Sequence, residues 1–365
     1  MLYRRMPIEA ESPEELGYSN IKYNLAESSV RDIDLREIYV SKKILLCYGS
    51  HRGKDELRKL IAKEYFSENI DNVLVTQGAA SALFIIHTTL LNANDEIIVL
   101  HPNYATNLET PYAIGCKIKT VELKFENQFN LKAEDVISKI TSKTKLVSLT
   151  NPHNPTGKVF NIHVLESIIS YCTRKKIFVL VDETYKDIPF PNFTHHVLND
   201  SPFLIRVSSL SKAYGVPGIR IGWIYCSNNS LIENFLSAKE QMVICNSVID
   251  EEIAFQILKK KKTILNRVAK DISSNYNLLS KWLKEQNVFD FVFPDAGVVM
   301  MPRLKSSIST KKFYSVLLDK HKTYVATGHC FQMSDHFFRL GFGWATGMEI
   351  KKGLAAIQKS ASPFI

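Results

Sequence analysis

Short runs of consecutive apolar, largely β-branched residues recur between positions 71 and 226, and longer helix-like segments separate them. The runs are NVLVT, EIIVL, KIKTVEL, KLVSLT, IFVLVD, FLIRVSS and IGWIYC. Strands that are apolar throughout are buried on both faces, and their alternation with helices is typical of a mostly parallel sheet. The pattern therefore predicts an α/β lobe whose sheet is covered by helices.

Beyond position 226 the apolar spacing becomes helical, over residues 231–243 and 250–285. It then changes to a hairpin-like mix in FDFVFPDAGVVMMPRL and FFRLGFGW. We expect a smaller α+β lobe there, to which the N-terminal segment returns. The predicted division is a large domain at residues 36–248 and a small domain made of residues 1–35 and 249–365.

Composition is that of a globular protein, because 365 residues with 45% hydrophobic content can bury a large core. The opening residues, MLYRRMPIEAESPEE, lack the apolar stretch of a signal peptide, and no run approaches the ~20 apolar residues that cross a bilayer. The six cysteines are widely spaced without a C-x-x-C pair, which argues against a zinc cage or a disulfide framework. We predict a cytoplasmic protein with neither a membrane partner nor a bound metal.

The net charge of +9 raises the question of nucleic acid binding. Much of the local basic excess lies in LKKKKTIL (residues 258–265), inside a helical pattern and without interleaved arginine and aromatic residues. A solvated helix face explains this run better, so we expect no nucleic acid partner. A basic surface would also concentrate small anionic substrates or a phosphorylated cofactor.

The stretch RVSSLSKAYGVPGIRIGW (residues 206–223) places Lys212 among small residues, with Ser209 before it and Arg220 after it. A lysine on the surface needs no such surroundings. The serine hydroxyl and the bidentate guanidinium are groups that bind phosphate.

VTQGAASAL (residues 75–83) follows a strand and opens a helix with Gly78, Ala79 and Ala80. Small residues there let backbone N–H groups and the positive helix end approach an anion closely. The same residues also occur wherever a helix packs tightly on a sheet, so the stretch alone is a weak phosphate signal.

Two further motifs end strands with polar groups. NPHNPTG (residues 151–157) puts two asparagines at a strand's carboxyl end, where α/β sheets bind ligands, and IFVLVDETY ends a buried strand on Asp182 with Tyr185 nearby. An aspartate at such an edge can simply cap the following turn. Beside Lys212, however, these groups would form a mutually neutralising cluster.

These stretches, in this order, resemble the aminotransferase class I/II family, the fold-type I enzymes that depend on pyridoxal 5'-phosphate (PLP). NPHNPTG, DETY and SLSKAYGVPGIRIGW are jointly very specific, and the resemblance covers most of the chain. Within the family, SKAYGVPGIRIGW, VICNS and FRLGFGW look most like the branch that includes capreomycidine synthase-like proteins.

The resemblance implies a role for each matching residue. Lys212 matches the lysine that forms a Schiff base with PLP and later moves a proton, which requires an amine whose pKa is lowered by burial beside cationic groups. Asp182 matches the carboxylate that keeps the pyridine nitrogen protonated, so that the ring accepts electrons. Asn154 and Tyr185 match the donors to the ring's phenolic oxygen, and Tyr104, in HPNYAT, matches the aromatic residue stacked on the ring.

The same comparison implies a phosphate site and a shared active site. The residues expected to hold the phosphate are Gly78, Ala79, Ala80, Ser209 and Arg220. Tyr48, in CYGSHRG, matches a tyrosine that reaches the phosphate of the neighbouring subunit, which implies a homodimer.

Substrate recognition is less explicit. Arg339, in FFRLGFGW, matches the arginine that binds the substrate α-carboxylate with Asn154 beside it, and an arginine in an apolar strand is costly to bury without an anion. Dicarboxylate-specific members use a second arginine, but Met242 lies in that region here, which argues against an acidic donor. Glu27, in NLAESSV, either faces solvent or binds a cationic side chain.

The reaction that the resemblance implies is transamination between an amino acid and a 2-oxo acid. The same residues also serve racemases, decarboxylases, lyases and cyclising enzymes, so fold does not fix the reaction. A PLP-binding regulator without catalysis is a further class, but about 30 residues before the motifs leave no space for a DNA-binding domain. A catalytically inactive scaffold would be expected to lose Lys212 or Asp182, and both are present.

Overall fold

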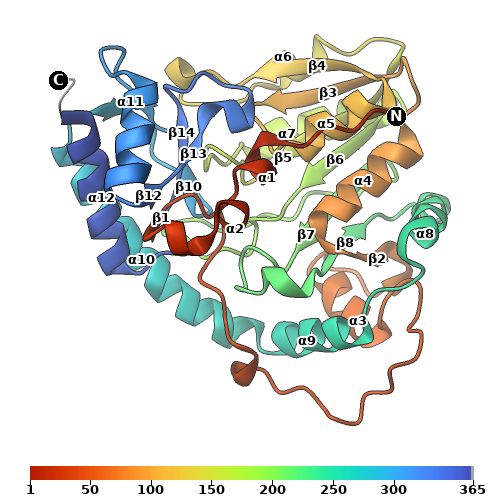
Figure 1. Cartoon of the computed structure of the whole chain (residues 1–365). Helices are drawn as coiled ribbons and strands as arrows, with labels where there is room; N and C mark the ends of the chain where they lie inside the picture. The colour runs from red at the N-terminus through yellow and green to blue at the C-terminus, as the bar shows by residue number, and fades with distance from the viewer. Residues whose placement is uncertain (363–365) are drawn as a thin grey trace.

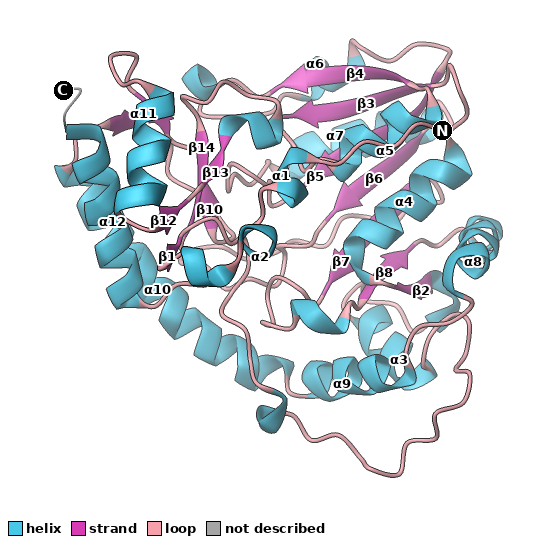
Figure 2. Ribbon diagram, in the orientation of Figure 1, coloured by secondary structure: helices cyan, strands magenta, loops and turns pink. Residues whose placement is uncertain are grey.

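A seven-stranded sheet lies at the centre of the computed structural model, which describes residues 1–362 (Figures 1 and 2). In spatial order its strands are β2 (Val73–Thr76), β8 (Gly222–Tyr225), β7 (Leu204–Ser209), β6 (Phe178–Asp182), β5 (Thr144–Thr150), β3 (Glu96–His101) and β4 (Lys117–Glu122). Every neighbouring pair is parallel except those of β8, which runs antiparallel to β2 and β7. The predicted α/β fold with a mostly parallel sheet is confirmed.

Helices cover both faces of this sheet, and side chains of β3 alternate between them. Ile97 and Val99 belong to an apolar cluster with α4 (Gly78–Leu90), α5 (Thr106–Ile114) and α8 (Asn229–Val243). Ile98 and Leu100 belong to a second cluster with α6 (Ala133–Ile137) and α7 (Ile162–Arg174). Because each strand is buried on both sides, its sequence is apolar throughout.

A third apolar cluster joins the end of the sheet at β2 to the C-terminal half of the chain. Its helices include α3 (Asp55–Lys63), α9 (Val248–Lys259), α10 (Lys261–Glu285) and α12 (Gly347–Ala361). Small sheets complete this part: β9 (Phe289–Asp290) with β11 (Arg303–Leu304), and β10 (Val299–Met300) with β14 (Phe338–Gly341) and β13 (Ala326–Thr327). The remaining short helical elements are α11 (Thr310–Ser315), η1 (Tyr18–Asn20), η2 (Leu35–Glu37), η3 (Ile70–Asn72), η4 (Phe125–Asn127), η5 (Pro217–Ile219), η6 (Val316–Lys320) and η7 (Gly328–Phe331).

The helix expected over residues 250–285 is two helices that meet at Lys260. Three of the four consecutive lysines there are exposed, whereas Lys261 pairs with Glu64 and Asp187. The turn lets α9 pack beside α3 while α10 packs beside α12. No glycine or proline marks the break, because tertiary packing rather than local propensity sets it.

The N-terminal segment crosses the front of the molecule through α1 (Pro7–Ala10) and α2 (Pro13–Leu16) (Figure 1). It then pairs in parallel, through β1 (Tyr23–Asn24), with β12 (Thr323–Tyr324) near the other end of the chain. Between α2 and α3 the chain loops away from the body, at the bottom of Figure 1. The N-terminal segment thus joins the C-terminal half, while the domain boundaries given above stay a prediction.

All six cysteines carry free thiols. Among residues 1–362 there is no helix whose length and apolar character would let it cross a membrane.

Candidate active site

A cavity of about 540 Å³ lies at the carboxyl ends of β5, β6 and β7. The N-terminal segment and β14 form its other walls, and sequence-predicted site residues from all these elements line it: Ala79, Ala80, Tyr104, Asn154, Asp182, Tyr185, Ser209, Lys212, Arg220, Arg339 and Glu27. In a parallel sheet the carboxyl ends of neighbouring strands meet at one edge, which is why motifs far apart in sequence converge here.

Lys212 lies in the loop after β7, and its Nζ donates a hydrogen bond to Ser28 Oγ at 3.0 Å. The loop packs closely on the N-terminal segment, because a Cβ at Gly215 would lie 2.2 Å from Arg31 O. Burial lowers the pKa of the Lys212 amine, and the charges of Arg339 and Arg220 lower it further, while Glu27 and Glu9 oppose them. A larger fraction of the amine is therefore neutral, as a nucleophile or a general base requires.

Asp182 ends β6 and is buried. The backbone N–H and the hydroxyl of Thr184 both donate to its Oδ1, at 3.0 and 2.5 Å. Burial raises the pKa of the carboxyl group, and the two Thr184 bonds oppose that rise. Since both bonds end on Oδ1, Oδ2 can accept a hydrogen bond from a protonated ring nitrogen in the cavity.

Tyr185 and Asn154 bring donors to the same space. Among residues 1–362, no group forms a hydrogen bond with the buried Tyr185 hydroxyl, and burial raises the pKa of this hydroxyl to about 12. Asn154 Oδ1 accepts from Arg339 Nη1 at 3.2 Å, which leaves its Nδ2 available to donate. A buried hydroxyl without a partner is uncommon, so this orphaned group fits a ligand oxygen.

An anion-sized cradle lies at the start of α4. Gly78 has a positive φ of 77°, and a Cβ there would lie 2.6 Å from Arg220 Nη2. A Cβ at Gly222 would lie 2.7 Å from Ala79 N, and Gly222 is the register partner of Ser209. Two glycines therefore let a guanidinium, a hydroxyl and a helix N-terminus gather closely, which suits a phosphate group.

Two residues close the cavity from other sides. Tyr104 is half-buried, and its hydroxyl donates to Glu9 Oε1 at 2.8 Å. Arg339 is 5% exposed, and its Nη2 donates to Ala26 O at 2.8 Å. Its Nε has no hydrogen-bond partner in the part of the chain that the structure describes. A buried guanidinium that lacks a carboxylate partner has capacity left for an anionic ligand.

Glu27 lines the cavity, whereas Tyr48 lies outside it. Glu27 is half-buried on the cavity wall, and its carboxylate accepts only a long bond from Ser29 Oγ, at 3.4 Å. Tyr48 is 79% exposed and does not line the cavity of its own chain. Its expected contact with a neighbouring subunit stays a prediction.

Sequence reasoning missed Thr184, Ser28 and Glu9. Thr184 stands inside the DETY motif and Ser28 beside Glu27, so both could have been proposed from their neighbours. Glu9 carries no such signal, because it meets Tyr104 across 95 positions of sequence.

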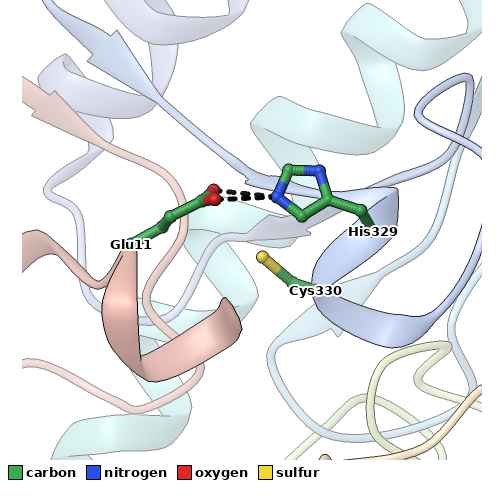
Figure 3. A group of neighbouring side chains, drawn as sticks. All are labelled: Glu11, His329 and Cys330. Atoms are coloured by element: carbon green, nitrogen blue, oxygen red, sulfur yellow. Dashed lines mark hydrogen bonds and ion pairs between the residues drawn. The ribbon is translucent and has the colours of Figure 1, made fainter. Parts of the chain in front are cut away.

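A second contact ties the N-terminal segment down (Figure 3). Glu11 accepts from His329 Nε2 at 2.9 Å, and Asp335 contacts Nδ1 at 2.9 Å. Burial alone would lower the pKa of His329, but the bonds to both carboxylates outweigh it, so the pKa is raised. Cys330 lies beside them, and the three donor atoms of Glu11, His329 and Cys330 are within 4.8 Å of one another. Glu11 and Asp335 therefore explain the position of His329, which forms a charged bridge between them.

Comparison with known proteins gives one family. The model for aminotransferase class I and II matches residues 16–357. An aspartate aminotransferase from Sulfolobus acidocaldarius is 30% identical over 315 residues, covering 81% of this chain and 78% of that protein. An arginine–pyruvate transaminase from Pseudomonas aeruginosa is 27% identical over 295 residues, covering 78% and 74%.

The predicted branch also finds support at a distance. Capreomycidine synthase from Streptomyces vinaceus is 25% identical over 315 residues, which cover 85% of this chain and 80% of that protein.

Among solved structures, a PLP-dependent aminotransferase from Streptococcus suis superposes with a TM-score of 0.92 at 24% identity, covering 100% and 99% of the two chains.

Proposed function

Because the chain belongs to the aminotransferase class I and II family, whose enzymes depend on PLP, we propose that it transfers an amino group between a non-acidic amino acid and a 2-oxo acid. The observation that carries this proposal is the convergence of Lys212, Asp182 and Arg339 on one cavity.

The cavity fits the cofactor of the family. The cradle at Gly78 and Arg220 suits the phosphate, and Asp182 Oδ2 suits the protonated ring nitrogen. The orphaned Tyr185 hydroxyl suits the phenolic oxygen. Tyr104 would cover the ring face. PLP, when bound, supplies an aldehyde carbon and an electron-accepting ring.

The chain's own residues would then perform three tasks. Lys212, with its lowered pKa, would hold the aldehyde carbon and, once displaced by the donor, carry the proton from the donor's α-carbon. Asp182 would keep the ring nitrogen protonated, an interaction that strengthens as negative charge develops. Arg339 and Asn154 would bind the α-carboxylate and fix the α-carbon beside Lys212.

A non-acidic donor is supported by the basic groups of the cavity. Within the described chain its lining contains three, which are Lys212, Arg220 and Arg339, and each has a task above. Met242 occupies the region that would supply a second arginine from the partner subunit. A distal carboxylate would therefore lack a counterion. The similarity to an aspartate aminotransferase favours an acidic donor instead, so the preference among donors has to be measured.

The alternative is another PLP reaction on an amino acid, and the similarity to capreomycidine synthase favours a cyclisation among these. A PLP-binding regulator without catalysis is not favoured, since Lys212 and Asp182 are both present and converge.

The functional unit is proposed to be a homodimer. The loop between α2 and α3 exposes the apolar residues Tyr39, Leu45, Leu46 and Tyr48. Several exposed apolar residues within ten positions are typical of an interface, and a second copy would cover them. Mixing Lys212→Ala with Tyr48→Ala should restore activity that neither variant has, because one site per mixed dimer is then intact. No gain on mixing would contradict shared sites.

The transamination itself is tested by single-turnover spectra of the purified holoenzyme. Amino acids are added one at a time, and the absorption of the cofactor is followed. Conversion to the pyridoxamine form, with release of the matching 2-oxo acid, is the expected result. Release of carbon dioxide, ammonia or a cyclic product without that conversion would replace transamination with the alternative.

A further inference from the structure

The outer part of the active-site cavity is lined by carboxylates, although the chain as a whole has a net charge of +9. Four of them have no role in the cofactor site described above: Glu9, Glu14, Glu27 and Asp32. We propose that these carboxylates form a binding site for a cationic amino-acid side chain, an ammonium or a guanidinium. The proposal rests on the transamination proposed above and names the class of its donor.

The four carboxylates have no cationic partner in the part of the chain that the structure describes. Glu9 accepts from the Tyr104 hydroxyl, Glu27 from Ser29 Oγ and Asp32 from the Trp344 indole N–H. Within residues 1–362, no lysine, arginine or histidine side chain forms an ion pair with any of them. Glu11, which lines the same cavity, differs from them because it is paired with His329. The negative charge is therefore available to a ligand.

Glu27 is held in a fixed position relative to the group that binds the α-carboxylate. Arg339 Nη2 donates to the carbonyl of Ala26, the residue before Glu27. On the same strand, a Cβ at Gly341 would lie 1.9 Å from Glu27 O, so the two backbones are in direct contact. The orphaned Nε of buried Arg339 itself indicates an anionic ligand here. An amino acid bound by its carboxylate therefore sits next to Glu27.

Glu9 approaches from the other side, fixed by its bond to Tyr104. Burial lowers the pKa of Lys212, and the charges of Glu27 and Glu9 both act against that effect, so both lie within electrostatic range of the reacting amine. Burial raises the pKa of Tyr18, and Glu14, Glu27 and Asp32 raise it further. All four carboxylates line the same cavity, with Glu9 and Glu27 half-buried and the other two exposed.

A half-buried carboxylate loses hydration, and the single hydroxyl bond that Glu9 and Glu27 each accept offsets this loss only in part. A cationic side chain would compensate Glu9 and Glu27 for the lost hydration, whereas a neutral side chain would not. Each partly exposed ion pair should contribute about a two- to fivefold preference, and Glu9 and Glu27 together about five- to twentyfold.

The test compares arginine with citrulline in single-turnover reactions of the holoenzyme. The side chain of citrulline has nearly the same shape as that of arginine but carries no charge. Ornithine, methionine and aspartate complete the set. We expect kcat/KM for arginine to exceed that for citrulline by about five- to twentyfold, and the excess to fall as salt is raised.

Variants then locate the recognition. Glu27→Gln and Glu9→Gln should each reduce the arginine-to-citrulline ratio about two- to fivefold. Because both carboxylates also act on the pKa of Lys212, kcat/KM can change for every donor, and the ratio is the measure of recognition. The matched control is Glu15→Gln, because Glu15 neighbours Glu14, pairs with Arg5 and does not line the cavity. It should leave the ratio as it is.

The failures of the two proposals are distinguishable. If donors are converted to 2-oxo acids but arginine and citrulline react equally, the cationic site is refuted and transamination stands. A higher kcat/KM for aspartate than for arginine would also refute the cationic site. If arginine is preferred to citrulline in binding spectra but no 2-oxo acid appears, the cationic site is supported and transamination is refuted.

Discussion

Gly78→Ala tests whether the start of α4 holds the cofactor phosphate together with Arg220. Gly78 has a φ of 77°, and a new Cβ would lie 2.6 Å from Arg220 Nη2. Alanine in the left-handed region costs about 1–2 kcal/mol, so the free energy of unfolding should fall by that amount. This strain is present with and without cofactor and does not by itself change affinity.

Affinity should change through the guanidinium. Arg220 is exposed, and its guanidinium can withdraw from the new Cβ if it gives up the bond from Nη1 to Pro217 O. It then loses its position beside the phosphate. A hydrogen bond to a charged group contributes about 1.5–3 kcal/mol, which predicts a Kd for PLP that is roughly 10- to 150-fold higher. Titration of the apoprotein with PLP, followed by absorbance and tryptophan fluorescence, measures this Kd.

Gly115→Ala is the matched control. Gly115 also has a positive φ, of 93°, but its Cβ would make an ordinary contact of 3.5 Å with Ala93 Cβ, at the end of α5. It should lose comparable stability and keep its PLP affinity. In an Arg220→Ala background, Gly78→Ala should weaken PLP binding little further. Wild-type affinity in Gly78→Ala, or an equal loss in Gly115→Ala, would refute the assignment of the phosphate site.

Three further predictions concern single residues. Lys212→Ala should keep the fold and bind PLP through its phosphate but lose the borohydride-reducible link to the protein; a retained link would mean that another lysine carries it. Asp182→Ala should lower turnover by ~10³-fold or more while changing cofactor occupancy far less, because the lost contact strengthens with developing charge; near-normal turnover would show that another group serves the ring nitrogen. Since the folded-state pKa of His329 is raised, its bridge to Glu11 should stabilise the protein fully below about pH 6.5 and be lost as pH rises through the raised pKa. Melting temperatures of wild type and His329→Gln should therefore converge with rising pH, and a constant difference would contradict the bridge.

The sheet and its ends could be predicted from the sequence because both are local signals. Strands buried on two faces are apolar throughout, as in β3, and polar motifs directly after them fall at one edge of the sheet. That is why Asn154, Asp182 and Lys212 converge as their spacing suggested. The break between α9 and α10 at Lys260 could not be predicted, since four lysines in a row continue a helical pattern and only packing against α3 and α12 turns the chain.

The N-terminal segment shows where the same reasoning ends. The residues proposed to bind PLP follow strand ends, and the sheet fixes them whatever the substrate is. In the proposed donor site, the side chain of the donor would instead meet Glu9, which is placed by one hydrogen bond to Tyr104, and Glu27, which follows Ala26, whose carbonyl accepts from Arg339 Nη2. The contact of Glu9 with Tyr104 spans 95 positions of sequence, and that of Ala26 with Arg339 spans 313. Neither contact requires a particular residue next to Glu9 or Glu27 in the sequence. A segment held in this way can change its charges without disturbing the sheet, so donor choice can differ between proteins that share every cofactor motif. The arginine-to-citrulline ratio is thus a property of the N-terminal segment, and exchanging Glu27 for glutamine should change it while leaving PLP affinity as in the wild type, because the Glu27 carboxylate accepts only from Ser29 within residues 1–362.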